Sequence, residues 1–311
     1  MLYQLSYTPA LAEGGPLTKV PMLGNPLCLD ARRAVSACPI MHAPKRPPVP
    51  VETLLLAYRS GIFPMADKRD DPEVFWVEPR ERAIIPLDGL HLSKSLKKVL
   101  KADKFAVTVD RAFEQVIRAC AEPRPDHPDT WISERIVQSY LGLHRAGHAH
   151  SVECWQVGAQ GWPELVGGLY GVSFDRVFCG ESMFSRVPDA SKVALVWLVA
   201  LMRRAGYVLL DCQFMTEHLR SMGARELAQA DYRRLVQNAQ GKPAMPITAA
   251  WQQFVPEAEL PYAAGAGEGA AAAGDGAADG AGDGLAEASA LGDAGPSSPG
   301  KRIVQSLTQT S

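Results

Sequence analysis

Phe178-Cys-Gly-Glu-Ser-Met-Phe-Ser-Arg186 and, downstream, Leu210-Asp-Cys-Gln-Phe214 are two short runs typical of strands, and each ends in polar residues. A packed sheet buries polar groups only at a cost in free energy, so such residues often mark a functional site. Alternate side chains of a strand leave the same face, so Asp211 and Gln213 are predicted to lie together. Glu181 is predicted to follow the end of its strand, where the sheet opens into a loop.

These polar residues also have a purely structural interpretation. A buried Glu181 needs a partner, and an ion pair with Arg186 or Lys192 would supply one. Asp211 and Gln213 would equally suit a strand end whose polar side chains bond the backbone of neighbouring loops. The residues alone leave both interpretations open.

The sequence around the two runs predicts a mixture of helices and strands. Periodicity and turn residues predict strands at 74–77, 82–85, 150–157, 165–174, 176–180 and 207–214. Helices are predicted at 51–60, 92–100, 111–121 (opening at Asp110), from a cap at Ser133 to Gly147, at 190–204 (capped by Asp189) and at 217–222. This order indicates an α+β fold whose second half is built on one curved sheet.

The two ends of the 311-residue chain differ from its body. Residues 1–48 are rich in Pro and Gly and are expected to be an extended appendage, with Met41 as an alternative start of the native chain. The Ala/Gly/Asp-rich tail, residues 263–311, carries a net charge of −4, so residues 1–262 carry +2. The tail is expected to be disordered. The expected divisions are 1–48, a small N-terminal α/β domain at 49–79, a larger domain at 80–240, a C-terminal segment at 241–262 and the tail at 263–311.

Composition favours a soluble protein of the reducing cytoplasm. The six cysteines form no CxxC pair, and no apolar run approaches the ~20 residues that a membrane-spanning helix needs. His148 and His150 are too few for a metal site without a third ligand, so neither a metal nor another cofactor is expected. A mildly basic body permits a polyanionic partner without requiring one.

Four lysines lie on one side of the helix predicted at 92–100. Their spacing of i, i+3, i+4 and i+7 aligns Lys94, Lys97, Lys98 and Lys101. Taken alone, this pattern is more typical of a solvated helix face than of a nucleic-acid site, because no aromatic residues are interleaved for base stacking.

An ordered set of short motifs covers residues 54–235. They are Ala57-Tyr…Gly61-Ile-Phe-Pro, Phe75-Trp…Pro79-Arg80, His91-Leu-Ser-Lys-Ser-Leu, Thr130-Trp-Ile132, Leu143-His-Arg-Ala-Gly-His-Ala-His-Ser-Val-Glu153, Leu165-Val-Gly-Gly-Leu-Tyr-Gly171, Ala190-Ser-Lys192 and the two runs quoted first. Each motif is weak by itself, but the ordered set resembles the leucyl/phenylalanyl-tRNA–protein transferases.

The resemblance implies a small N-terminal α/β domain and an acetyltransferase-like (GNAT-type) C-terminal domain with one curved mixed sheet. It implies transfer of Leu or Phe from aminoacyl-tRNA to the free α-amine of proteins beginning with Arg or Lys, which creates a degradation signal. It also implies no cofactor, no metal and no membrane. The residues implied are Asp211 and Gln213 at the reacting centre, Glu181, Phe178 and Trp131 in the aminoacyl pocket, and Lys94, Lys97, Lys98 and Lys101 on the tRNA.

Two positions depart from the pattern of the family. Met65 stands where many members have Trp after Ile-Phe-Pro, and Leu198 stands at an aromatic position of the long helix. Because both belong to the implied aminoacyl pocket and Met is deformable, the preference among Leu, Phe and Met donors stays open.

The implied chemistry is attack by the α-amine on the ester carbonyl. The hypothesis is that Gln213 accepts a hydrogen bond from the amine and that Asp211 orients the Gln213 amide. Either Asp211 or Glu181 would attract the cationic side chain of the acceptor.

Two other classes of protein are alternatives. An acyl-CoA-dependent N-acetyltransferase would need a Gly-rich loop before the long helix, and Ser185-Arg-Val-Pro-Asp-Ala190 offers none. A non-catalytic tRNA-binding protein would leave Glu181, Asp211 and Gln213 unexplained.

Overall fold

The computed structural model describes residues 18–19, 46–123, 129–255 and 298–309. Its helices are α1 (Val51–Arg59), α2 (Lys94–Lys101), α3 (Phe113–Cys120), α4 (Glu134–Arg145), α5 (Ala190–Ala205), α6 (Glu217–Ser221), α7 (Gln229–Asn238), α8 (Ile247–Phe254) and α9 (Pro299–Thr308). Its strands are β1 (Thr18–Lys19), β2 (Phe63–Met65), β3 (Phe75–Glu78), β4 (Glu81–Ile85), β5 (Ala106–Val109), β6 (Ala149–Val157), β7 (Pro163–Phe174), β8 (Val177–Ser185), β9 (Leu209–Gln213) and β10 (Arg225–Ala228).

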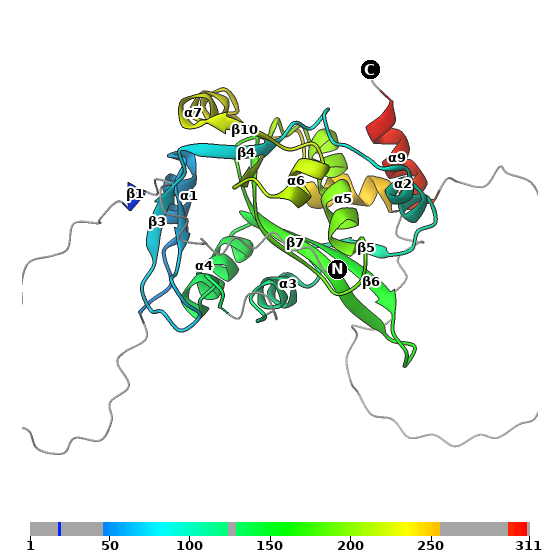
Figure 1. The fold of residues 1–311 in the computed structure, drawn as a ribbon, viewed down its shortest axis with the longest axis horizontal. Coiled ribbons are helices and arrows are strands. Elements are labelled where there is room, and N and C mark those ends of the chain that lie inside the picture. The colour runs from blue at the N-terminus through cyan, green and yellow to red at the C-terminus, as the bar shows by residue number, and fades with distance from the viewer. Residues whose placement is uncertain (1–17, 20–45, 124–128, 256–297, 310–311) are drawn as a thin grey trace, which may run out of the picture.

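A seven-stranded mixed sheet forms the centre of the molecule (Figure 1). Its order is β10-β4-β9-β8-β7-β6-β5, and every neighbouring pair is antiparallel except β8 and β9, which run parallel. A parallel pair needs a crossover, and the long helix α5 supplies it. The α+β class and the curved mixed sheet expected from the sequence are therefore present.

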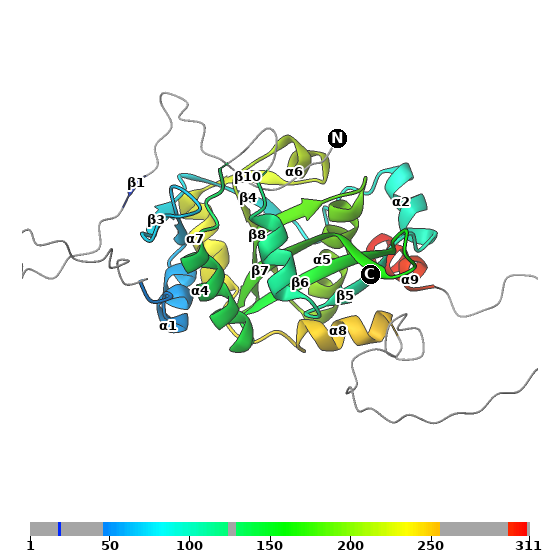
Figure 2. The same ribbon diagram turned by 90° about the horizontal axis from the view of Figure 1, so that it is seen from below.

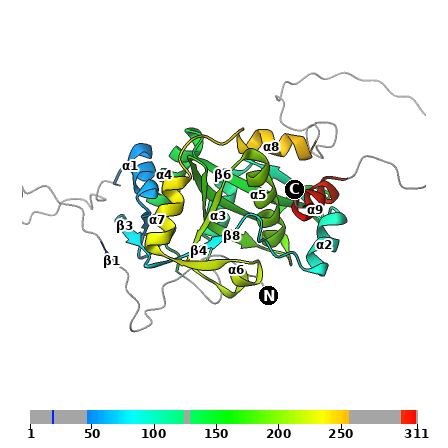
Figure 3. The same ribbon diagram turned by 90° about the horizontal axis from the view of Figure 1, so that it is seen from above.

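Helices cover both faces of this sheet. The α5 side, seen in Figure 3, also carries α2, α8 and α9, and α3 and α4 pack on the opposite face, seen in Figure 2. Strand alternation divides the core accordingly, because Phe178 and Leu210 pack on the α5 side while Cys179 and Leu209 pack on the other. No helix among the described residues is long and apolar enough to cross a membrane.

The small sheet β1-β3-β2 and helix α1 lie at one end of the molecule (Figure 1). Their apolar side chains do not form a separate core. Leu54 of α1 and Phe63 of β2 belong to the same buried cluster as Tyr140 of α4 and Tyr170 of β7. Contacts of this segment therefore reach directly into the large sheet.

Three local expectations are wrong. Strand β8 continues through Glu181 to Ser185, with a register shift against β7 beside Glu181, so this residue lies inside the sheet. Asp189 does not cap α5, because its backbone is left-handed and the Ser185 hydroxyl instead accepts from the Ser191 amide. Asp110 does not cap α3 but binds His150 and the amide of Ser151.

The last part of the tail is also ordered, contrary to the disorder expected for 263–311. Residues 256–297 lie outside the described residues, but Pro299–Thr308 form α9. The physical reason is that Ile303 and Val304 repeat at helical spacing with Leu307 and bury against α2, α5 and α8. Of the expected appendage, only the stretches at 18–19 and from 46 onward are described.

Candidate active site

A fully buried ion pair lies at the centre of the candidate site. Arg82 on β4 is 1% exposed and Asp211 on β9 is 0% exposed. The Arg82 Nη2 atom lies 2.6 Å from Asp211 Oδ2, and Arg82 Nε donates to Oδ1 at 2.9 Å. Burial lowers the pKa of the Arg82 guanidinium, but the Asp211 carboxylate more than offsets this, so the net pKa of Arg82 is raised and the guanidinium stays charged.

The remaining atoms of this pair are also engaged. The Tyr232 hydroxyl of α7 and the Cys179 thiol of β8 both donate to Asp211 Oδ2, and the Gln213 backbone amide donates to Oδ1. Arg82 Nη1 donates to the carbonyl of Gly61, and the guanidinium stacks on the Tyr232 ring at 4.4 Å. Asp211 is therefore shielded from any substrate and fixes the backbone at the end of β9.

Gln213 has a backbone conformation unusual for its residue type. Its φ angle is +63°, in the left-handed region, and the register of β4 against β9 shifts beside it. The Asp211 carboxylate holds this turn by accepting a hydrogen bond from the Gln213 backbone amide. Backbone strain of this kind persists only where surrounding contacts enforce it, and it concentrates at functional sites.

Glu181, not Asp211, orients the side-chain amide of Gln213. The Gln213 Nε2 atom donates to Glu181 Oε1 at 2.8 Å, and the Tyr140 hydroxyl donates to Glu181 Oε2 at 2.9 Å. The hydroxyls of Tyr140 and Tyr58 are themselves hydrogen-bonded. Because the NH2 group of the Gln213 side-chain amide faces a carboxylate, the carbonyl oxygen of the same amide remains as an acceptor. The hypothesis that Asp211 orients this amide is thus corrected.

Glu181 is the titratable group of this cluster. Burial raises its pKa to about 7, although hydrogen bonds from Tyr58, Gln213 and Tyr140 oppose the shift. The expected ion pairs with Arg186 or Lys192 are absent, because Arg186 binds Glu122 and Lys192 lies 3.9 Å from Asp189. The Glu181 charge is therefore held by neutral donors.

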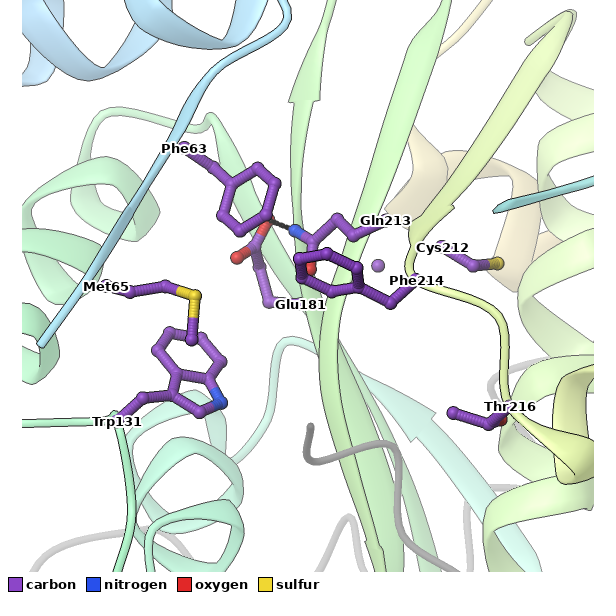
Figure 4. A pocket seen from close by; sticks show the side chains of 9 residues that line it. Phe63, Met65, Trp131, Glu181, Cys212, Gln213, Phe214 and Thr216 are labelled. Carbon is purple, nitrogen blue, oxygen red and sulfur yellow. Dashed lines mark hydrogen bonds between the residues drawn. The ribbon is translucent and has the colours of Figure 1, made fainter. Parts of the chain in front are cut away.

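An open pocket ends at this cluster (Figure 4). Aromatic and sulfur-containing side chains make most of its wall, and the Glu181–Gln213 hydrogen bond lies at its inner end. The rings of Phe63 and Phe214 meet edge to face at 5.8 Å. The lining residues are Phe63, Met65, Trp131, Gly180, Glu181, Cys212, Gln213, Phe214 and Thr216.

Two residues expected in the pocket are not among its lining. Phe178 and Leu198 are buried in the core on the α5 side of the sheet. Alternation along β8 turns Phe178 to the α5 face, and Leu198 lies in the middle of a helix that covers that face. Trp131, Met65, Glu181 and Gln213 line the pocket.

Several important residues were not singled out from the sequence. Phe63 lies in the Ile-Phe-Pro motif, but nothing in the motif indicates that its ring lines a pocket. Arg82 offered a usable signal, since an arginine that opens an apolar run in a predicted strand needs a buried counter-charge. Tyr58, Tyr140 and Tyr232 come from three different helices, and no local pattern connects them to the two strands.

The lysine face, defined as Lys94, Lys97, Lys98 and Lys101 on α2, is linked to the pocket rim through α6. Three of its lysines are exposed and Lys97 is half-buried, and none of them forms an ion pair within the described part of the chain. Just before α2, the His91 amide donates to the carbonyl of Met222, at the end of α6. Thr216, which lines the pocket, caps the other end of α6.

The sequence matches two family models in the order in which the segments occur. Residues 49–80 match the leucyl/phenylalanyl-tRNA protein transferase N-terminal domain, and residues 84–237 match leucyl/phenylalanyl-tRNA protein transferase. A leucyl/phenylalanyl-tRNA–protein transferase of Novosphingobium aromaticivorans is 57% identical over 267 residues, which cover 85% of this chain and 97% of that protein. The chain belongs to the leucyl/phenylalanyl-tRNA–protein transferase family.

Other relatives carry the same family name. The transferase of Rhizorhabdus wittichii is 54% identical over 190 residues, covering 61% of this chain and 75% of that protein. Among solved structures, L-PGS from Bacillus licheniformis matches with a TM-score of 0.29 and 14% identity over 55% of each chain, which is too weak to bear on the fold. Membership of the leucyl/phenylalanyl-tRNA–protein transferase family makes the chain an enzyme of the aminoacyltransferase class.

Proposed function

We propose that the chain transfers Leu or Phe, with Met as a further donor, from aminoacyl-tRNA to the α-amine of proteins beginning with Arg or Lys. The observation that carries the proposal is the Gln213 amide, clamped by Glu181 at the inner end of an apolar pocket. The apolar wall matches the chemistry of the donor side chain, and the polar end matches that of the amine and ester. The free space is only about 30 Å³, so the wall residues must move to admit a Leu or Phe side chain.

The reaction is aminolysis of an ester. The amine nitrogen attacks the ester carbonyl, a C–N bond forms, the bond to the 3′ oxygen of the tRNA breaks, and a proton passes from the amine to that oxygen. An α-amine titrates near ~8, so a sizeable fraction is already neutral at pH 7 and needs no strong base. Positioning by the Gln213 carbonyl oxygen supplies most of the acceleration.

Glu181 and Asp211 have separate duties in this mechanism. The Asp211 charge is neutralised by Arg82, so it does not attract the acceptor. The hydrogen-bond donors to Glu181 among the described residues are neutral, so its negative charge favours an Arg or Lys side chain and the positive charge that develops on the attacking nitrogen. Met65, beside Trp131 on the pocket wall, adjusts to donors of different shape (Figure 4).

The raised pKa of Glu181 predicts a distinctive pH profile. As the pH falls, protonation of the acceptor amine near ~8 and of Glu181 near ~7 both reduce activity, so log kcat/KM should fall with a slope approaching 2 in acid. The Glu181→Gln variant keeps an amide oxygen for Gln213 but has nothing to titrate, so its slope should be 1. Initial rates between about pH 5 and 9 with an Arg-initiated peptide measure this. Equal slopes in the two proteins would remove Glu181 from the mechanism.

The lysine face predicts the salt dependence of tRNA binding. Each phosphate neutralised contributes roughly 0.7–0.9 to the slope of log affinity against log salt. Replacing all four lysines of α2 by alanine should therefore lower that slope by about 2–4. Fluorescence titration of aminoacyl-tRNA at several salt concentrations measures it, and an unchanged slope would return the four lysines to a solvated face.

The direct test of the proposed function is transfer of labelled Leu from Leu-tRNA to an Arg-initiated peptide. Product should form with a peptide beginning with Arg or Lys and not with one that begins with an acidic residue. Binding of tRNA without transfer would identify a tRNA-binding protein instead. Use of acetyl-CoA as the donor would identify an acetyltransferase.

The finer description of the fold and of its setting belongs to the same proposal. The single parallel pair β8–β9 within an antiparallel sheet supports an acetyltransferase-like domain at 80–240, preceded by an α/β unit at 49–79. The buried cysteines 154, 179 and 212 form no disulfide within the described residues, which supports a reducing cytoplasm, where the modified proteins would be degraded.

A further inference from the structure

Helix α9 lies directly beside α2, the helix that carries the lysine face (Figures 1 and 3). The backbones meet at Gly300, where a β-carbon would lie 1.8 Å from the carbonyl oxygen of Leu100. The Gly300 amide donates to the Asp103 carboxylate at 2.7 Å. Only glycine permits this approach, so the start of α9 is fixed against the end of α2.

The buried side of α9 determines which residues face outward. Ile303 is fully buried and Val304 is 5% exposed, both in the core that surrounds α5. At the other end of the helix, Arg203 of α5 donates to the carbonyl of Leu307. The exposed side of α9 therefore carries Lys301, with Gln305 one turn further on.

Both helices carry exposed lysines on neighbouring segments. Neither α2 nor α9 contains an acidic residue. At their junction the Asp103 carboxylate accepts a hydrogen bond from the Gly300 amide, so one acidic side chain lies beside the lysines. Lys301 forms no ion pair within the described ranges. Gly300 contacts Leu100, so the residues that follow them, Lys301 and Lys101, both lie near this contact.

We propose that α9 is part of the tRNA-binding surface, with Lys301 contacting a backbone phosphate next to those bound by Lys98 and Lys101. This inference rests on the proposed function of the lysine face. The sequence model of the family ends at residue 237, so the family match assigns nothing to this helix. A segment from beyond the residues that the family model matches therefore packs beside α2.

Charge and position favour an RNA backbone as the occupant. The lysines of α2 span about 10 Å along the helix, and Lys301 extends the row by roughly one more phosphate contact, within a Debye length of ~8–10 Å. The row begins beside His91, which is joined through α6 to the pocket rim. In the proposed complex the 3′ end of the tRNA enters the pocket, and the adjoining RNA backbone lies over α2 and α9.

The test compares single variants in tRNA binding at different salt concentrations. Lys301→Ala should reduce the magnitude of the salt slope by about 0.7–0.9, so its affinity loss should be roughly threefold greater at 50 mM than at 200 mM salt. Gln305→Ala is the matched control on the same helix and should leave the slope unchanged. Lys98→Ala reports the proposed lysine face independently.

The outcomes separate the two proposals. A slope lowered by Lys98→Ala but not by Lys301→Ala would overturn the role of α9 and leave the proposed function intact. Unchanged salt slopes in both variants would contradict tRNA binding by the lysine face and by α9. Loss of Leu transfer with unchanged tRNA binding would bear only on the proposed catalytic residues. Gly300→Val, which forces the helices apart, should weaken tRNA binding more than Lys301→Ala while the protein stays folded by circular dichroism; binding equal to that of the unmodified protein would count against the proposal.

Discussion

Replacement of Arg82 by methionine is expected to lower the free energy of unfolding by about 3–5 kcal/mol. The substitution leaves the Asp211 carboxylate buried and without a counter-charge, although Tyr232 and Cys179 still donate to it. An uncompensated buried charge costs several kcal/mol, far more than the hydrophobic gain of a methionine side chain. Urea unfolding followed by circular dichroism measures the loss.

Two controls show whether burial is the reason. Arg118 is 45% exposed and pairs with Glu114 and Glu134, so Arg118→Met should cost no more than about 1 kcal/mol. The double variant Arg82→Met with Asp211→Leu removes both charges and should recover much of the stability lost in Arg82→Met. If Arg118→Met and Arg82→Met cost the same, the pair is not the buried anchor described here.

Replacement of Gln213 by alanine is expected to lower kcat about 100- to 1,000-fold while tRNA affinity changes less than about twofold. In the proposed mechanism the tRNA is held by its phosphates on the lysine face, whereas the Gln213 amide acts only on the reacting amine. Single-turnover transfer and tRNA titration on the same preparation separate the two quantities. Equal loss of transfer and of affinity would contradict the role given to Gln213.

A glycine variant separates the chemistry of Gln213 from its backbone strain. Because the φ angle of Gln213 is +63°, glycine adopts this conformation without a steric penalty but alanine does not. Gln213→Gly should therefore be about 1 kcal/mol more stable than Gln213→Ala. Both variants should be equally slow, and a recovery of transfer in Gln213→Gly would mean that strain, not the amide, limits the alanine variant.

Local patterns were sufficient for the long strands and the long helix of the second half, but they did not predict α7, α8 and α9. Alternation and length predicted the strands at 150–157 and 165–174, which correspond to β6 and β7, and continuous apolar periodicity predicted α5. The order of strands was beyond reach, because β4 inserts between β9 and β10 through contacts more than 100 residues apart in sequence. Short elements such as β5 and β10 depend on those partners and have little signal of their own.

For the candidate site, the sequence indicated residues but not their roles. Glu181, Asp211 and Gln213 stood out as polar residues in apolar runs, and all three belong to one connected cluster. The left-handed turn at Gln213 reverses the simple alternation, so the side-chain amide of Gln213 meets Glu181 and not Asp211. Arg82 and the three tyrosines are brought together only by the tertiary fold, which no spacing rule describes.

The distances along the chain between members of this cluster set the order in which the enzyme matures during synthesis. Arg82 leaves the ribosome 129 residues before Asp211, its partner, and Tyr58 precedes Tyr140 by 82 residues. At roughly 5–20 residues per second, the arginine waits about 6–26 seconds, hydrated and unpaired, for its carboxylate. The pocket cannot close around Gln213 in a partial chain. The enzyme is thus inactive until nearly all of its own catalytic region has been made.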